Sequence, residues 1–99
     1  MKNSKYVITR TAIELALELG LSPADGVEIE LRSDLNDKIV EVIKKKKITH
    51  AQVAKLARTS RTRITAIVNR NTQDISTDLM LRVLSSLGVY AKIHFKSVA

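Results

Sequence analysis

Two short amphipathic segments flank a tight turn between residues 49 and 69. Thr49 is placed to cap the first segment as a helix, and Gln52 supplies the polar partner of a capping box. Ser60 is placed to cap the second segment, because its hydroxyl can accept from an unpaired backbone N–H of the first turn. The spacing therefore predicts two short helices with Arg58 in the turn between them.

Apolar residues recur at helical spacing in both segments and predict their buried faces. Ala54 is small, and a small residue lets two helices cross closely over a short turn. Ile64 is placed to anchor the second helix on the core. This spacing is typical of a helix-turn-helix, although a plain helical hairpin would share part of the pattern. The predicted inward side chains are Val53, Ala54, Ala57, Ile64, Ile67 and Val68, with Leu56 at the margin.

The positive charge of the chain is concentrated around the same segment. The 99 residues carry 17 Lys and Arg against 10 Asp and Glu, a formal net charge of +7. Nine of the basic residues, and no Asp or Glu, lie between Lys44 and Arg70, so the remaining residues carry a net charge of −2. A solvated surface would explain the run Lys44–Lys47 alone. Its coincidence with the predicted motif instead favours an electrostatic footprint for nucleic acid.

Composition excludes several other classes of protein. The chain has no cysteine, which rules out disulfides and thiol chemistry and is typical of a reducing compartment. Aromatic residues make up 3%, which argues against stacking of single-stranded bases. No apolar run or N-terminal pattern predicts a membrane span or a secretory signal, so we expect a cytoplasmic protein. His50 and His94 lack partners at ligand or catalytic spacing, so we expect no enzyme activity, metal or cofactor.

The sequence before the motif predicts two further helices. Residues 12–19 are strongly helix-forming, Gly20 stops this helix, and its apolar residues are ordinary core material. Ser22 then caps a second helix, with Pro23 in its first turn. That helix reaches the lysine run either unbroken or interrupted between Gly26 and Ser33, and the sequence leaves both possibilities open.

The sequence after the motif predicts one helix and one strand. The helix covers residues 75–87, with Ser76 as its cap and Gly88 as its stop. Residues 89–96 then alternate between apolar and polar side chains, which predicts a half-buried strand. A strand needs a partner for its backbone groups, either Tyr6–Thr9 or the same strand of a second copy. The predicted buried face of the helix consists of Met80, Val83, Leu84 and Leu87.

These elements predict a mainly α-helical fold, a compact bundle of about five helices with one C-terminal β-strand. A single domain is expected over residues 1–99. Its parts are an N-terminal extension and first helix in 1–32, a helical core in 33–88 with the helix-turn-helix at 49–69, and the strand at 89–96.

The second helix of the motif carries side chains suited to the major groove of DNA. Arg61 can give a guanine two parallel hydrogen bonds, and threonines can bond base edges or touch a thymine methyl. The N-terminus of the helix capped by Thr49 is suited to a phosphate. The candidate base-reading residues are Ser60, Arg61, Thr62, Thr65 and Ala66, and candidate phosphate contacts are Thr49, Arg63, Asn69 and Arg70.

On these residues, Thr49–Asn69 resembles the helix-turn-helix of Cro/C1-type (XRE) regulators. Residues 18–96 are similar to the compact HigA-like antitoxin and phage-type subgroup, in the order of their caps, helices and stops. The resemblance implies a lambda-repressor-like fold. It places base readout on Ser60, Arg61, Thr62 and Ala66, and phosphate contacts on His50, Arg63 and Asn69. Two positions depart from the pattern: Arg58 stands where a turn glycine is frequent, and Ala66 where a longer polar residue is frequent.

The resemblance also implies a homodimer on a palindromic double-stranded operator in a prokaryotic cell or phage, where it represses its own operon. The alternative function is that of an antitoxin that neutralises a RelE-like ribonuclease toxin, with the segment before Ser33 as the candidate toxin-binding region. A nonspecific RNA or nucleoid binder is a third possibility, distinguished by steep salt dependence without sequence preference.

Overall fold

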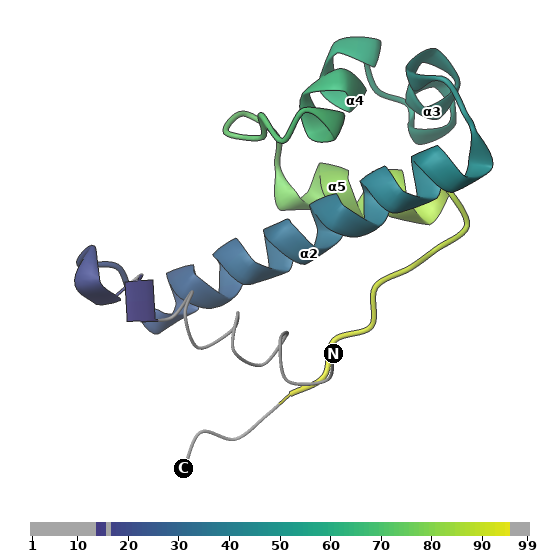
Figure 1. Ribbon diagram of the computed structural model, residues 1–99. Coiled ribbons are helices and arrows are strands. Elements are labelled where there is room, and N and C mark those ends of the chain that lie inside the picture. Colours follow the sequence, from purple (N-terminus) through teal and green to yellow (C-terminus); the bar gives the residue numbers. More distant parts are fainter. Residues whose placement is uncertain (1–13, 16, 96–99) are drawn as a thin grey trace. The chain divides into compact units, whose positions relative to one another are not determined.

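The computed structural model describes residues 14, 15 and 17–95, which fall into two compact units, one up to Asp34 and one from Leu35 onward. Helix α2 (Pro23–Lys46) begins in the first unit and continues into the second without interruption (Figure 1). The break that the sequence left possible between Gly26 and Ser33 is therefore absent.

The described part of the first unit contains the end of one helix and the start of α2. Residues 14, 15, 17 and 18 are helical. Gly20 follows with φ +78°, and its N–H donates to the Leu17 carbonyl oxygen at 3.1 Å. The predicted glycine stop is confirmed, because only glycine adopts this left-handed backbone at no steric cost.

The start of α2 is capped by a reciprocal pair of hydrogen bonds. The Asp25 N–H donates to the Ser22 hydroxyl at 3.2 Å, and the Ser22 N–H donates to Asp25 Oδ2 at 2.9 Å. The Ser22 hydroxyl also donates to the same carboxylate at 2.9 Å. The predicted cap is therefore present, and the backbone bond from Ser22 lowers the pKa of Asp25 below its ordinary value.

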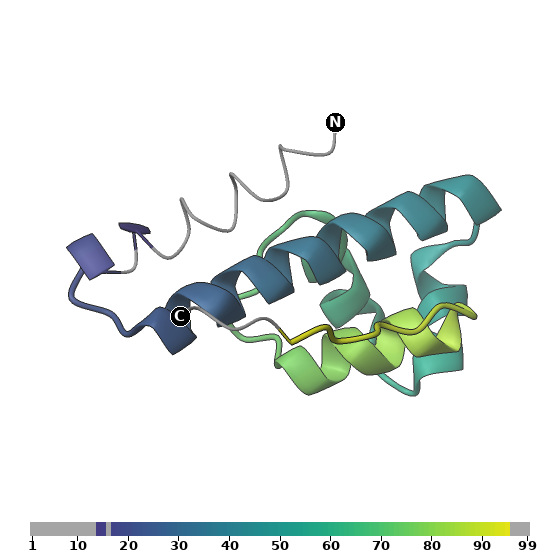
Figure 2. The same cartoon turned by 90° about the horizontal axis from the view of Figure 1, so that it is seen from below.

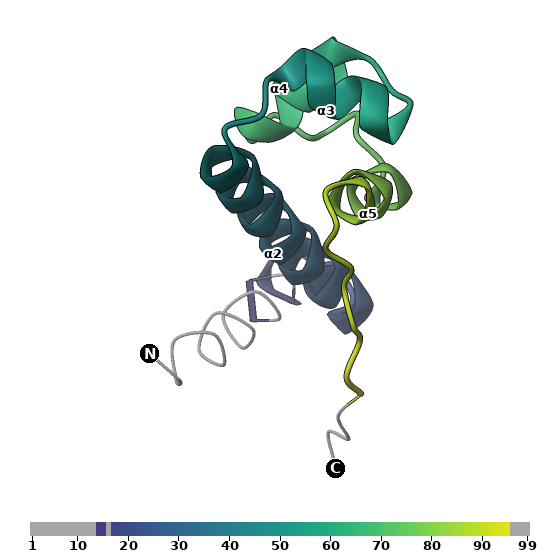
Figure 3. The same cartoon turned by 90° about the vertical axis from the view of Figure 1, so that its right-hand side faces the viewer.

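The second unit joins the later part of α2 to three shorter helices, α3 (His50–Ala57), α4 (Arg61–Val68) and α5 (Thr77–Ser86). In Figures 2 and 3, this part of α2 and α5 run alongside each other. The pair formed by α3 and α4 lies across them on one side, as the end-on view of Figure 3 shows.

One core holds the second unit together, and it receives side chains from all four helices. The predicted buried face of α5 is confirmed, as are the inward positions of α3 and the two isoleucines of α4. Val68 is only half-buried, and Leu56 is exposed. The buried apolar residues are Leu35, Ile39, Val42, Ile43, Val53, Ala54, Ala57, Ile64, Ile67, Ile75, Leu79, Met80, Val83, Leu84 and Leu87.

The mainly helical fold is confirmed, whereas its finer details are not. Helices α2–α5 account for the regular structure of the described part beyond the helical residues before Gly20, and no strand occurs in residues 17–95. The expected helix over 12–19 lies partly outside the described residues. Tyr6–Thr9, a candidate partner of the expected strand, and Lys96, its last residue, lie wholly outside them. A strand exists only where its backbone pairs with a neighbour. Residues 89–95 form no such pairing in the described part of this chain. The strand expected over 89–96 therefore stays a prediction.

Candidate nucleic-acid interface

The start of α3 is fixed by Thr49. Its hydroxyl accepts from the Gln52 N–H at 3.1 Å, while the Thr49 N–H donates to Gln52 Oε1 at 2.9 Å. This is the predicted capping box, which satisfies two backbone N–H groups at once. It sets where α3 begins and thereby which faces His50 and the buried Val53 occupy.

The start of α4 is fixed in the same way by Ser60. The Ser60 hydroxyl accepts from the Arg63 N–H at 3.2 Å, and the helix begins at Arg61. Ile64 and Ile67 are both fully buried, so they hold one face of α4 on the core. The first three residues of the helix, Arg61, Thr62 and Arg63, are consequently all exposed.

The turn between α3 and α4 has a left-handed residue, although that residue is arginine. Arg58 has φ 55° and ψ 50°, and its N–H donates to the Lys55 carbonyl at 3.3 Å. The Thr59 N–H donates to the Ala54 carbonyl at 2.9 Å, which completes a Schellman motif. Arg58 therefore adopts the left-handed conformation that glycine would adopt without strain, at a conformational cost of about 1–2 kcal/mol.

Two more helices end on a left-handed basic residue. Lys47 follows α2 with φ 54°, and Arg70 follows α4 with φ 58°. In each case the N–H of the following residue donates to a carbonyl of the preceding helix. Ile48 donates to the Ile43 carbonyl, and Asn71 donates to the Ala66 carbonyl. Three basic residues within the segment 44–70 thus occupy backbone positions that favour glycine.

The end of α4 is held by two neighbouring residues of α2. Asn36 is 4% exposed, and its Nδ2 donates to the Ile67 carbonyl at 3.0 Å. Arg70 forms an ion pair with Asp37 at 2.6 Å, with both side chains more than half exposed. The phosphate contact of Arg70 stays a prediction, and the structure shows its guanidinium joining the end of α4 to α2.

Two other cations bind carbonyl groups at helix ends. Lys46 Nζ donates to the Leu87 carbonyl at 2.9 Å, and Arg82 Nε donates to the Ala57 carbonyl at 3.1 Å. Such carbonyls lack intrahelical partners and favour positive charge. These roles, like that of Asn36, are not predicted by the sequence, because no spacing rule links residues so far apart in the chain.

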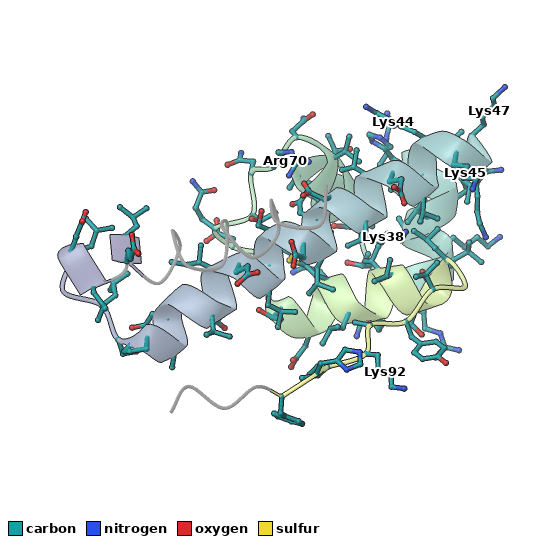
Figure 4. All side chains as sticks on the ribbon, turned by 60° about the horizontal axis from the view of Figure 1, so that its bottom comes forward. Lys38, Lys44, Lys45, Lys47, Arg70 and Lys92 are labelled. Carbon is teal, nitrogen blue, oxygen red and sulfur yellow. The ribbon has the colours of Figure 1, made fainter. Side chains whose placement is uncertain are left out.

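The basic segment forms an exposed surface. All nine of its Lys and Arg residues are exposed, including Lys46 and Arg70 with their structural contacts. Figure 4 shows Lys44, Lys45 and Lys47 extending outward from the end of α2. The remaining members are Lys55 and Arg58 from α3 and its turn, and Arg61 and Arg63 from the start of α4.

A hydrogen bond connects the two helices of the motif directly. His50 Nδ1 lies 2.9 Å from the Thr65 hydroxyl oxygen, and both residues are half-buried. This bond brings together a residue expected at a phosphate and one expected at a base edge. Of the other candidates, Ala66 is half-buried in α4, and Asn69 is exposed directly after it.

Comparison with known proteins identifies a family for this chain. The family model for a helix-turn-helix domain matches residues 17–96, which is most of the chain. No curated protein and no solved structure matches. In the described part, no helix is long and apolar enough to cross a membrane, and no group of three His, Asp or Glu side chains is placed to hold a metal ion.

Proposed function

The chain belongs to the helix-turn-helix domain family of DNA-binding regulators, and we propose that it is a sequence-specific transcriptional repressor of the Cro/C1 type. In this proposal α4 enters the major groove of double-stranded DNA. Repression follows because a protein seated on an operator that overlaps a promoter excludes the polymerase. The proposed target is the operator of its own operon.

The observation that carries this proposal is the exposed start of α4. Ser60, Arg61 and Thr62 are exposed at the N-terminal end of a helix whose opposite face is anchored by fully buried isoleucines. A rigidly held helix presents its polar groups at defined positions, which hydrogen-bond readout requires. Arg61 supplies the strongest contact, since a bidentate bond to guanine contributes about 1–3 kcal/mol of discrimination.

The surrounding charge accounts for affinity rather than for specificity. Basic side chains that neutralise phosphates release counterions, so binding weakens steeply as salt concentration rises. Arg63 and the exposed lysines at the end of α2 are suited to this role. Thr49 and His50 stand at the N-terminus of α3, where backbone N–H groups also attract a phosphate.

We further propose that the C-terminal segment pairs with its copy in a second chain. Ile93 is 65% exposed and Phe95 is 94% exposed, and they share a face in the alternating pattern. Antiparallel pairing across a two-fold axis would bury both side chains and satisfy the backbone. Light scattering should give the mass of a dimer, and Phe95→Asp should reduce it to that of a monomer, whereas Lys92→Asp should not.

The test of the proposed function is selection of bound duplexes from a random DNA pool. A repressor of this kind should enrich a symmetric sequence whose half-sites are about one helical turn apart. The protein with Lys38→Ala is a suitable control, because it loses one exposed positive charge outside the basic segment. Absence of any enriched sequence, with salt-dependent binding retained, would instead favour a nonspecific nucleic-acid binder.

A second candidate function is that of an antitoxin for a RelE-like ribonuclease. It is favoured by the exposure of Leu15, Leu17 and Leu19 in the first unit, since exposed apolar groups at neighbouring positions are typical of protein-binding surfaces. The product of the adjacent gene should co-purify with the chain, and Leu15→Asp with Leu19→Asp should abolish this. The exposed Leu56 in α3 provides the control substitution. An adjacent gene that encodes no small ribonuclease would contradict this function.

A further inference from the structure

The hydrogen bond between His50 and Thr65 restricts what Thr65 can offer to DNA. A threonine hydroxyl has one proton to donate and two lone pairs that accept. Its oxygen lies 2.9 Å from His50 Nδ1, so one of these capacities is already used within the protein. Which one is used depends on whether Nδ1 carries a proton.

In the two cases the Thr65 hydroxyl offers DNA opposite hydrogen-bonding groups, a donor in one and only acceptors in the other. If Nδ1 is protonated, the ring donates to the hydroxyl, and Thr65 keeps its own proton for an acceptor on DNA. If Nδ1 is unprotonated, the hydroxyl donates to the ring, and Thr65 presents only lone pairs. A base edge that matches lone pairs must donate, and the major-groove donors are the amino groups of cytosine and adenine.

In a neutral ring, a phosphate at the other ring nitrogen decides between these cases. A neutral imidazole has a single N–H, so a ring that donates from Nε2 to a phosphate has an unprotonated Nδ1. We propose that His50 is a positioning residue for base readout: with its Nε2 proton on a DNA phosphate, its Nδ1 accepts from Thr65, and Thr65 therefore accepts from the exocyclic amino group of a cytosine or an adenine.

The position of His50 in the fold supports this role. His50 is the first residue of α3, and its backbone is set by the capping box of Thr49. Thr65 lies one turn beyond the exposed start of α4, between the buried Ile64 and Ile67 in the sequence. Both residues of the hydrogen bond thus lie on helices that are held by caps and core contacts. The imidazole ring of His50 therefore links binding of a DNA phosphate to the choice of base.

This inference rests on the proposed function, and its test separates the two. Duplexes that differ at one base pair in each half-site are made from the sequence selected by the wild-type protein. Thr65→Val identifies the base pair that Thr65 contacts, since this substitution removes the hydroxyl and keeps the shape. There, replacing the contacted cytosine or adenine by an analogue that lacks the exocyclic amino group should weaken wild-type binding by about three- to tenfold, and Thr65→Val should lose that preference for the amino group.

Two substitutions at His50 then distinguish positioning from simple phosphate binding. His50→Leu should abolish the preference at the Thr65 base pair and also weaken binding to every duplex. His50→Asn retains an acceptor near the position of Nδ1, so it should keep the preference while losing overall affinity. Thr62→Val provides the control, because it should alter a different base pair whose preference His50→Leu leaves unchanged. Nitrogen NMR of the complex should show the proton of His50 on Nε2.

Several results would overturn the inference without touching the proposed function. One is a His50→Leu protein that binds all duplexes more weakly by the same factor and keeps the preference at the Thr65 base pair. Another is wild-type binding that stays unchanged when the exocyclic amino group is removed from the cytosine or adenine of that base pair, and a third is a protonated Nδ1 in the complex. A wild type without any sequence preference would instead refute the proposed function itself.

Discussion

The two units of the chain use their apolar residues in opposite ways, although one helix runs through both. In α2, Val27 and Ile29 are about half exposed, whereas Leu35 and Ile39 are 3% and 0% exposed. Every residue of the described part with a buried apolar side chain belongs to the second unit. Helical spacing predicts an amphipathic face in both cases, but a face becomes core only where other elements close over it.

The largest expected difference between the units lies in the cost of removing an apolar side chain. Ile64→Ala should lower the free energy of unfolding by about 2–5 kcal/mol, because it leaves a cavity at a fully buried site. Leu19→Ala, at a site that is 65% exposed, should change it by less than about 0.5 kcal/mol. Urea unfolding measures both. An equal cost for the two substitutions would mean that Leu19 is buried in solution.

The next largest expected effect on the free energy of unfolding concerns a buried hydrogen bond in the second unit. Asn36→Ala should cost about 1–3 kcal/mol, because it removes the Nδ2 group that reaches the Ile67 carbonyl in the interior. Asn69→Ala at an exposed site beside the same helix end should cost less than about 0.5 kcal/mol. Thermal unfolding of the two variants gives the comparison. A small effect of Asn36→Ala would show that α2 does not hold the end of α4.

The turns of the two units differ as well, since Gly20 ends a helix in the first unit and Arg58 ends α3 in the second. Arg58→Gly should raise the free energy of unfolding by up to about 1 kcal/mol, because glycine removes the left-handed strain but gains freedom when unfolded. Lys55→Gly, inside α3, should lower it by about 1 kcal/mol. A destabilising Arg58→Gly would mean that the arginine side chain makes a contact worth more than this strain.

The smallest expected effect concerns pH and the first unit. Hydrogen bonds from Ser22 lower the pKa of Asp25 below its ordinary value of 3.8. The charged carboxylate therefore stabilises the start of α2 fully above the unfolded pKa, and this contribution is lost as pH falls through the lower folded pKa. Carbon NMR titration should show the lowered pKa, and Ser22→Ala should return it only part of the way toward 3.8, because the backbone N–H of residue 22 still donates to the carboxylate. A wild-type Asp25 pKa that is not lowered would contradict the cap.

Much of the second unit could be predicted from sequence because its signals are local. Thr49, Ser60 and Ser76 each lie within four residues of the N–H that they cap, so residue type and spacing suffice. The buried faces of α3 and α5 follow from the same short-range periodicity. Local signals of this kind are therefore enough to predict the helix-turn-helix and the exposed start of its second helix.

The remaining features depend on residues that are distant in sequence. Asn36 meets Ile67, and His50 meets Thr65, only because the helices cross. The left-handed Arg58 could not be predicted from its side chain, because the surrounding packing overrides an unfavourable intrinsic preference. The exposure of the leucines that precede Gly20 could not be predicted either, since apolar composition indicates burial but not the partner that provides it.

The central claim is that α4 reads sequence while the surrounding charges provide affinity. Its most direct test measures the affinity of the wild type, Arg61→Ala and Arg63→Ala for the selected operator and for a scrambled duplex at several salt concentrations. Arg61→Ala should weaken operator binding by about 1–3 kcal/mol and leave the scrambled duplex nearly unchanged. Arg63→Ala should weaken both alike and reduce the salt slope by about one. An Arg61→Ala protein with unchanged preference for the operator would contradict the claim.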